Sequence, residues 1–326
     1  MTDRIQRQQD SPADGAANTL GDGRWETGAP AAHQRQPLRV AGCQFDIGPE
    51  IGANLAEILR LIDLAADRQA RVAHFPETAL TGYAGADIAS TAEIDWESLH
   101  RATERICDKA RQRNIWVLLG STHRLSPDVL PHNSVYIIND QGRVLDRYDK
   151  RFCTGIIQPE PQRDLRHYTP GNHTPIFEIE GYRASVLICY DYRFPELYRD
   201  LKQRGVEVVF QSFHNARFSR EVYEQKNLWR EVVPGTMTGH AACNHLWISA
   251  TNSSTQYSLW PTFFVQPDGQ ITGRLTDHET GVLISEVDPS KPLWDAPGPW
   301  RQRAWLGELH SGELVDDPKS RDRTAY

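Results

Sequence analysis

Hydrophobic and polar residues form regular patterns from residue 38 onward. Residues 38–45 read as a mostly apolar strand, and residues 72–75 and 115–119 as two more. Between these strands, apolar residues recur at spacings of three and four, which predicts helices after Pro49 and over 96–113. The apolar face of the first helix consists of Leu55, Ile58, Leu59, Ile62 and Ala66. The first third of the chain therefore alternates between strand and helix.

The pattern changes after about residue 130, where short strands come in pairs. Residues 133–145 contain two strands around a polar turn, and residues 176–188 contain two more around Gly181, so each segment predicts a hairpin. Further strands are predicted over 206–210 and 246–250, and a closing antiparallel pair within 263–287. Strand–helix alternation combined with hairpins predicts an α/β chain with a mixed sheet.

The chain divides into a central domain and two flanking segments. Nothing in the composition marks a boundary inside residues 37–288, where helices are predicted over 196–204 and over 221–244, the latter interrupted at Pro234-Gly235. Residues 1–36 contain few large aliphatic side chains, so we expect a mobile N-terminal extension. Residues 289–326 are rich in Trp, Pro and charged residues, and they do not form a self-contained unit.

The composition argues against several classes of protein. A net charge of -7 and a pI near 6.0, without a long basic run, argue against nucleic acid as a partner. The five cysteines stand singly, which argues against a disulfide framework or a zinc ribbon and for a reducing compartment. No apolar run reaches the length of a membrane span, and residues 1–36 lack the pattern of a secretory signal. We therefore expect a cytoplasmic protein that does not bind membranes.

Cys189 lies at a junction that favours reactivity. It follows the apolar run 186–188 and precedes a polar turn, Pro195 and the helix predicted over 196–204. A thiol at the end of a buried strand is partly exposed, and a following helix N-terminus favours its thiolate form. A cysteine behind three aliphatic residues is also typical of plain core packing. The position alone leaves both interpretations open.

Two further segments supply the polar groups that a cysteine nucleophile needs. Glu77 follows the strand 72–75, and Lys150 ends a Tyr-Asp-Lys segment after the first hairpin. Attack on an amide carbon requires a nucleophile, a proton shuttle and a cation that stabilises the oxyanion. Cys189, Glu77 and Lys150 can fill these roles in that order. Taken singly, the two charged segments fit a solvated turn and a surface charge cluster equally well.

Three motifs in order resemble those of the nitrilase superfamily of carbon–nitrogen hydrolases. They are residues 75–83 around Glu77, residues 148–150, and residues 187–196, whose Cys-Tyr-Asp-Tyr-Arg-Phe-Pro-Glu sequence resembles that of amidase-type members. The resemblance implies a four-layer α-β-β-α sandwich with mixed sheets. It also implies hydrolysis of a small amide through a thioester on Cys189, without a metal or an organic cofactor. Members of the family pair, so we expect a homodimer or a larger homo-oligomer in which the tail 289–326 packs on the partner.

The resemblance also suggests five residues that line the substrate pocket: Tyr83, Asp164, Tyr190, Arg193 and His214. In the family, the backbone N–H at the position of Tyr190 helps to hold the oxyanion. Arg193 has a structural alternative, an ion pair with Glu196, and His214 has another, a satisfied buried histidine. His240, Cys243 and His245 are close in sequence but fit no zinc signature, so we expect no metal site there.

Two departures from the family pattern leave the substrate open. The second glutamate of the family is replaced by Asp164, six residues before Pro170, and Glu160 is a competing replacement. A third possibility is that Asp164 only begins a turn. The helix around residues 236–244 also differs from that of many relatives. Hydrolysis of an N-carbamoyl group and a catalytically weak, ligand-binding homologue therefore remain as alternatives, while the context of Cys189 favours amides over nitriles as substrates.

Overall fold

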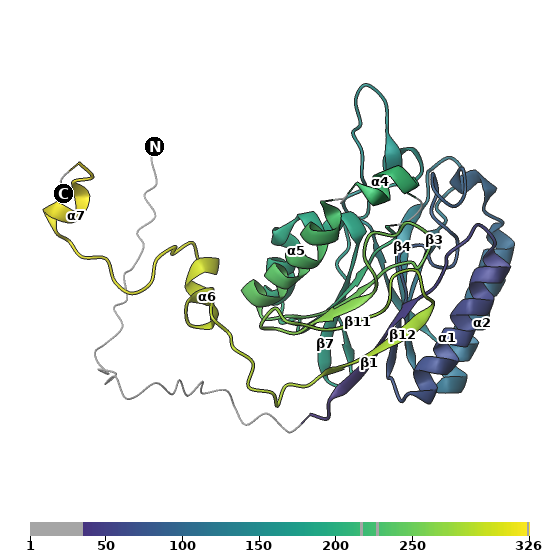
Figure 1. Cartoon of the computed structure of the whole chain (residues 1–326), viewed down its shortest axis with the longest axis horizontal. Helices are drawn as coiled ribbons and strands as arrows, with labels where there is room; N and C mark the ends of the chain where they lie inside the picture. Colours follow the sequence, from purple (N-terminus) through teal and green to yellow (C-terminus); the bar gives the residue numbers. More distant parts are fainter. Residues whose placement is uncertain (1–34, 216–217, 226–227, 325) are drawn as a thin grey trace, which may run out of the picture. The chain divides into compact units, whose positions relative to one another are not determined.

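The computed structural model describes residues 35–215, 218–225, 228–324 and 326, so the predicted N-terminal extension lies almost wholly outside the described residues. Within the described part, the strands form two six-stranded sheets (Figure 1). The first sheet has the order β12 (Gly281–Val287), β1 (Leu38–Gln44), β2 (Val72–His74), β3 (Trp116–His123), β4 (His132–Ile138), β5 (Val144–Asp149). The second has the order β11 (Ile271–Arg274), β10 (Phe263–Val265), β9 (Trp247–Thr251), β8 (Val208–Ser212), β7 (Tyr182–Ile188), β6 (Phe177–Ile179).

Helices cover the outer face of each sheet, which gives four layers. Two helices pack on the first sheet, α1 (Ile51–Asp67) and α2 (Trp96–Arg113). Two others pack on the second sheet, α3 (Pro195–Gln203) and α5 (Trp229–Asn244). Both sheets contain parallel and antiparallel pairs. The predicted α-β-β-α sandwich with mixed sheets is therefore confirmed. The shorter helices are α4 (Arg220–Glu224), α6 (Gly298–Trp305), α7 (Pro318–Arg321), η1 (Thr91–Glu93), η2 (Arg163–Arg166) and η3 (Cys189–Arg193).

Helix α2 shows how local sequence sets an element's bounds. Asp95 accepts hydrogen bonds from the backbone N–H groups of Glu97 and Ser98, which caps the first turn. Asn114 ends the helix in the left-handed conformation with φ 52°. The buried residues in between are Leu99, Ala102, Ile106 and Ala110. Their spacing places them on one face, so the helix matches the prediction over 96–113.

A polar bridge joins the two sheets beside the carboxyl end of β2. The ring nitrogens of His74 lie 3.0 Å from the hydroxyl oxygens of Ser249 on β9 and Ser212 on β8. Burial lowers the pKa of His74 to about 3, so the imidazole is neutral and links the sheets without a buried charge. The Ser212 hydroxyl also donates to the carbonyl of Phe75, two residues before Glu77. The bridge therefore fixes the segment that carries Glu77.

The structure corrects two details of the prediction. Helix α5 continues through Pro234, and the break lies between α4 and α5 instead. The ring of Pro234 costs one backbone hydrogen bond, but the helix buries Val233 and Met237 against the second sheet. The closing antiparallel pair is formed by β10 and β11 alone, whereas β12 crosses to the first sheet and pairs with β1. No helix in the described ranges is both long and apolar enough to cross a membrane.

Candidate active site

The ends of four strands bring the predicted polar residues together. Glu77 follows β2 and Lys150 follows β5 in the first sheet. Cys189 follows β7 and His214 follows β8 in the second sheet. Because the sheets face each other, side chains from both converge on the space between the strand ends.

Lys150 is the centre of the cluster. Its Nζ lies 2.8 Å from Oε1 of Glu77, 2.8 Å from Oδ2 of Asp164 and 3.3 Å from the hydroxyl of Tyr83. The lysine side chain has no exposed surface. Burial disfavours its charge, but attraction by Glu77, Tyr83 and Asp164 outweighs burial and raises the pKa of Lys150 well above its usual value. The site therefore contains a fixed, buried cation.

Glu77 is buried and saturated with hydrogen-bond donors. Its Oε1 accepts from Lys150 and from Nδ2 of Asn133 at 2.7 Å. Its Oε2 accepts from the backbone N–H of His214 at 3.1 Å. The charge of this carboxylate also acts on the thiol of Cys189 and contributes to its raised pKa. Glu77 thus lies between the cation and the nucleophile, where it can take the thiol proton.

Cys189 has an unusual backbone conformation and a protonated side chain. Its φ of 38° is in the left-handed region, which is uncommon for any residue but glycine. Helix α3 begins at Pro195, close to its predicted start, and the short helix η3 begins at Cys189 itself. Burial, followed by the charge of Glu77, nevertheless raises the pKa of the Cys189 thiol well above its usual value, so burial outweighs any stabilisation of the thiolate by a helix N-terminus. The side chain of Cys189 is therefore a neutral thiol, which would need a base in order to act as a nucleophile.

Asp164, and not Glu160, lies beside Lys150, in the position predicted for the second carboxylate of the site. Besides Lys150, it accepts hydrogen bonds from the hydroxyl of Tyr83 and, at 3.0 Å, from the backbone N–H of Thr154. Burial works against ionisation of Asp164, but Lys150 outweighs it and lowers the pKa of the carboxyl. Glu160 is exposed and pairs with Arg166 at 3.0 Å. The geometry therefore favours Asp164 as the second carboxylate of the cluster and does not support a solvated turn.

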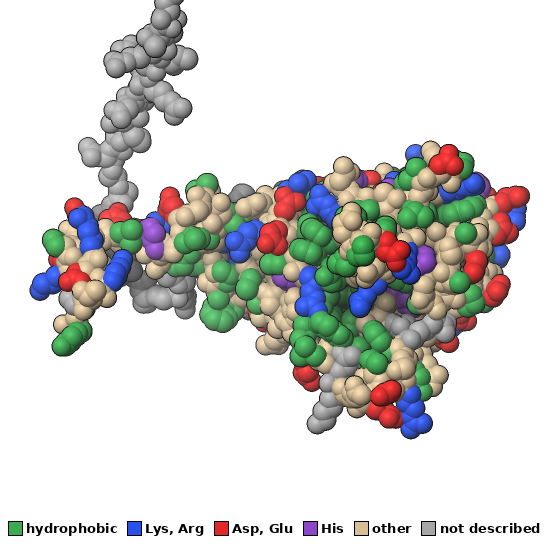
Figure 2. Space-filling model, turned by 90° about the horizontal axis from the view of Figure 1, so that it is seen from above, with side chains coloured by type: hydrophobic (Ala, Val, Ile, Leu, Met, Phe, Trp, Pro, Cys, Tyr) green, Lys and Arg blue, Asp and Glu red, His purple; other side chains and the backbone are tan. Residues whose placement is uncertain are grey.

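The remaining predicted residues lie around a cavity of about 880 Å³, here called the Cys189 cavity. Arg193 stacks over the rings of Tyr192 and Trp229 at 4.9 and 4.3 Å, and no ion pair between Arg193 and Glu196 occurs among the described residues. Tyr190 lines the same cavity. Figure 2 shows hydrophobic and basic side chains together around a hollow on one face of the molecule. The cavity thus combines apolar walls with positive charge.

His214 is held by an acidic residue that sequence reasoning did not find. Its Nε2 lies 2.6 Å from Oδ2 of Asp87, and both side chains are almost fully buried. Asn133, which binds Glu77, was also missed, as was Trp260 in the cavity wall. The only signal for Asn133 was a polar residue within a predicted buried strand. Asp87 gave no signal, because it lies 127 residues from His214 in the chain.

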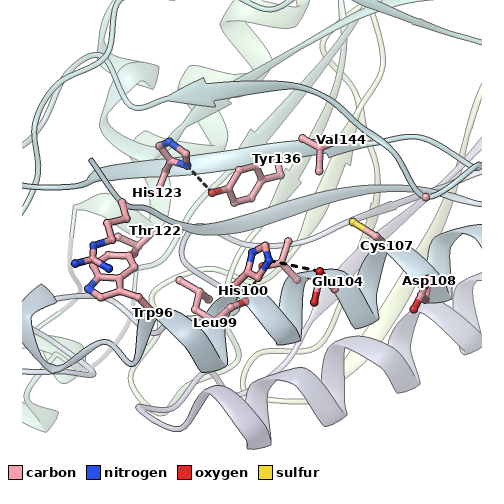
Figure 3. Close-up of a pocket in the computed structure, with 13 residues that line it drawn as sticks. Trp96, Leu99, His100, Glu104, Cys107, Asp108, Thr122, His123, Tyr136 and Val144 are labelled. Atoms are coloured by element: carbon pink, nitrogen blue, oxygen red, sulfur yellow. Dashed lines mark hydrogen bonds and ion pairs between the residues drawn. The ribbon is translucent and has the colours of Figure 1, made fainter. Parts of the chain in front are cut away.

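A second cavity of about 870 Å³, here called the Cys107 groove, lies between α2 and the strands β3 and β4 (Figure 3). It is lined by Trp96, His100, Glu104, Cys107, His123 and Tyr136, among others. Burial, followed by the charges of Asp108 and Glu104, raises the pKa of the Cys107 thiol. No lysine lines this groove. In the parts of the chain that the structure describes, no group of three or more His, Cys, Asp and Glu residues is placed to hold a metal ion.

Comparisons with known proteins point to one family. The family model described as carbon-nitrogen hydrolase matches residues 39–291. The chain is 26% identical over 222 residues to 2-oxoglutaramate amidase of Bacillus subtilis, covering 68% of this chain and 79% of that protein. It is 24% identical over 267 residues to nitrilase homolog 2 of Dictyostelium discoideum, covering 79% of this chain and 77% of that protein.

Solved structures with the same fold include an amidase from Nesterenkonia sp. That amidase superposes with a TM-score of 0.65 at 25% identity, covering 82% of this chain and 96% of the other. A mutant of a Nesterenkonia amidase in complex with butyramide gives a TM-score of 0.67 at 23% identity, covering 83% and 97%. Another carries the acetamide moiety of fluoroacetamide on its active-site cysteine, with a TM-score of 0.66 at 24% identity and coverage of 82% and 97%.

Proposed function

The chain belongs to the carbon–nitrogen hydrolase family and hydrolyses amide C–N bonds, and from this premise we propose that Cys189, Glu77 and Lys150 are its catalytic residues. The observation that carries the proposal is the buried Lys150, which contacts Glu77 and Asp164, while the charge of Glu77 acts on the thiol of Cys189. This arrangement unites a nucleophile, a base and a cation in one small volume.

The first half of the reaction forms a thioester. Glu77 takes the proton of Cys189 as Sγ attacks the amide carbon, and the charge that develops on the carbonyl oxygen faces Lys150 and the backbone N–H of Tyr190. When the tetrahedral intermediate collapses, Glu77 gives the proton to the departing nitrogen. The C–N bond breaks, and ammonia or an amine leaves.

The second half of the reaction releases the acid. Glu77 now takes a proton from water, whose oxygen attacks the thioester carbon. Collapse of the second tetrahedral intermediate breaks the C–S bond, and the proton returns to Sγ. Asp164 keeps Lys150 charged and oriented throughout, while Tyr83 donates to Asp164.

We propose that the substrate is a small amide that also carries a negative charge. Arg163, Arg166 and Arg193 line the Cys189 cavity, and within the described residues only Arg166 has an acidic partner, Glu160. The stacked guanidinium of Arg193 can present its N–H edge to a carboxylate. The name 2-oxoglutaramate amidase, borne by one relative, fits an acidic amide. His214, which Asp87 holds, lines the same cavity, and we expect it to contact the acyl chain.

We propose that the protein is a homodimer and that it is located in the cytoplasm. The tail 289–326 exposes large apolar side chains, including Trp294, Leu306 and Leu309, which are 73% to 81% exposed in the single chain. Side chains of this size favour contact with a partner. The five free cysteines suit a reducing compartment.

Ammonia release over a panel of compounds tests the proposal. We expect ω-amides of dicarboxylic acids to be hydrolysed faster than neutral aliphatic amides, and both faster than nitriles. The alternative of N-carbamoyl hydrolysis requires N-carbamoyl amino acids to give the highest kcat/KM. The alternative of a weak, ligand-binding homologue requires wild-type rates no higher than those of Cys189→Ala on every compound.

A further inference from the structure

A single buried carboxylate joins the segments that carry Lys150 and Cys189. Asp191 has no exposed surface. Its Oδ2 accepts hydrogen bonds from the hydroxyl of Tyr148 at 2.8 Å and from the backbone N–H of Ile188 at 3.0 Å. Its Oδ1 accepts from the backbone N–H of Phe152 at 2.9 Å. Tyr148 and Phe152 lie two residues before and two residues after Lys150, and Ile188 directly precedes Cys189. One side chain therefore fixes both segments.

No cation compensates the charge of Asp191 directly. It forms no ion pair within the described residues, and its three partners are a hydroxyl and two backbone N–H groups. Burial therefore raises the pKa of Asp191 to about 6, although the hydrogen bonds from Phe152, Tyr148 and Ile188 act in the opposite direction.

The titratable neighbours of Asp191 keep their charge state near neutral pH. Tyr148 from β5, Tyr198 from α3 and Cys153 from the loop after Lys150 are its neutral neighbours, and burial raises the pKa of each. Lys150 is the charged neighbour, and it stays protonated because Glu77 and its other partners outweigh burial. Within this cluster, Asp191 is the group that changes charge near pH 6.

We propose that Asp191 is a positioning residue that holds Lys150 and Cys189 in their catalytic relation, and that its protonation causes the loss of activity on the acid side of the pH profile. The inference rests on the proposed catalytic roles of these two residues. A neutral carboxyl accepts hydrogen bonds more weakly than a carboxylate. It also brings a new O–H into a site where all three partners already donate, and only the Tyr148 hydroxyl can turn round to accept it.

Tyr148→Phe tests the proposal without removing Asp191. The variant deletes a donor that stabilises the carboxylate, so the pKa of Asp191 rises and the acid limb of kcat moves to higher pH, by on the order of half a unit or more. Tyr136→Phe is the matched control. It removes a half-buried hydroxyl that hydrogen-bonds to His123 at 2.7 Å in the Cys107 groove, and it leaves the acid limb in place.

Asp191→Asn provides the second measurement. Asparagine has a similar shape but cannot ionise, and it offers one oxygen to three donors. We expect kcat to fall about a hundredfold with KM within a few fold, because Lys150 and Cys189 lose their relative placement. The acid limb near pH 6 should be absent in this variant.

The outcomes separate this inference from the proposed function. Suppose that the wild-type enzyme hydrolyses amides, but that the acid limb of kcat lies at the same pH in the wild type, Tyr148→Phe and Tyr136→Phe. The role proposed for Asp191 is then wrong, and the catalytic assignment stands. Wild-type kcat in Asp191→Asn leads to the same conclusion. If Asp191→Asn does not fold, the comparison of the two tyrosine variants decides. If the wild-type enzyme hydrolyses no amide, the proposed function itself fails.

Discussion

The Cys189 cavity and the Cys107 groove resemble each other in size and contents, yet only one contains the elements of a reaction. Their volumes are about 880 and 870 Å³, and each contains a cysteine, a histidine and an acidic residue. In both, burial raises the pKa of the thiol. They differ in what surrounds the sulfur. The thiol of Cys189 is under the influence of a buried carboxylate that is itself paired with Lys150, whereas Cys107 has two acidic neighbours and no lysine in its groove.

This difference shows that a thiol and a hollow do not define a catalytic site. A buried carboxylate can act as a base for a neutral thiol only while something stabilises its own charge, and Lys150, 2.8 Å from Glu77, is the group that we propose for this role. The acidic residues near Cys107, Glu104 and Asp108, lie on the exposed side of α2, where water solvates them. The following predictions test this contrast, from the largest expected effect to the smallest.

Replacing each cysteine in turn gives the largest contrast. We expect Cys189→Ala to lower kcat about 10⁴-fold or more, because the thioester cannot form. Cys107→Ala should retain wild-type kcat. The measurement is ammonia release from the best amide, with circular dichroism to confirm that both variants are folded. Residual activity of more than a few per cent in Cys189→Ala contradicts the covalent mechanism.

Lys150→Ala should reduce both activity and stability. We expect a loss of kcat of about 10³-fold, because the oxyanion loses its cation. Glu77 and Asp164 are then left as adjacent buried carboxylates, so the free energy of unfolding should fall by about 3–5 kcal/mol. Urea unfolding measures the second effect. Lys109→Ala, which removes a half-buried lysine paired with Asp63, is the control and should leave kcat unchanged.

Replacing the two acidic residues of the loop after Lys150 should affect kcat to different extents, with the larger loss at the residue that contacts Lys150. Asp164→Asn removes a charge that contacts Lys150, so we expect kcat to fall about tenfold to a hundredfold. Glu160→Gln breaks only an exposed pair with Arg166 and should have little effect. Steady-state kinetics on one amide decides between them. Equal rates in the two variants would remove Asp164 from the catalytic cluster.

Alkylation by iodoacetamide compares the two thiols within one molecule. We expect Cys189 to react about tenfold faster than Cys107, because Glu77 accepts its proton as the carbon–sulfur bond forms. In Glu77→Gln the two rates should become similar. Peptide mass spectrometry measures each site, and the exposed Cys243 provides an internal reference whose rate does not change.

Sequence reasoning was most accurate where local interactions decide the structure. The bounds of α2 follow from the Asp95 cap and the spacing of its buried residues, and both are visible in the sequence. The interruption predicted at Pro234 was wrong, because packing of α5 on the second sheet outweighs the loss of one backbone hydrogen bond.

Contacts between residues far apart in the chain could be predicted from the sequence only in part. Glu77, Lys150 and Cys189 were brought together by the resemblance to a family, since nothing local says that the two sheets face each other. Asn133 and Asp87 lie 56 and 127 residues from their partners, and no pattern links them. The high pKa of Cys189 was also beyond reach, because it depends on burial between the sheets.

The crowded environment of Glu77 has a consequence for the order of events in turnover. Its two oxygens already accept three hydrogen bonds, from Lys150, Asn133 and the His214 N–H, and the Cys189 thiol lies within reach of its charge, which leaves room for about one further donor. Water finds an acceptor there only after the sulfur has become a thioester and its proton has departed with the leaving nitrogen. If Glu77 is the base, the first product must leave before the second reactant can be activated. We therefore expect ping-pong kinetics, and we expect any small nucleophile that reaches the vacated position to compete with water for the acyl group.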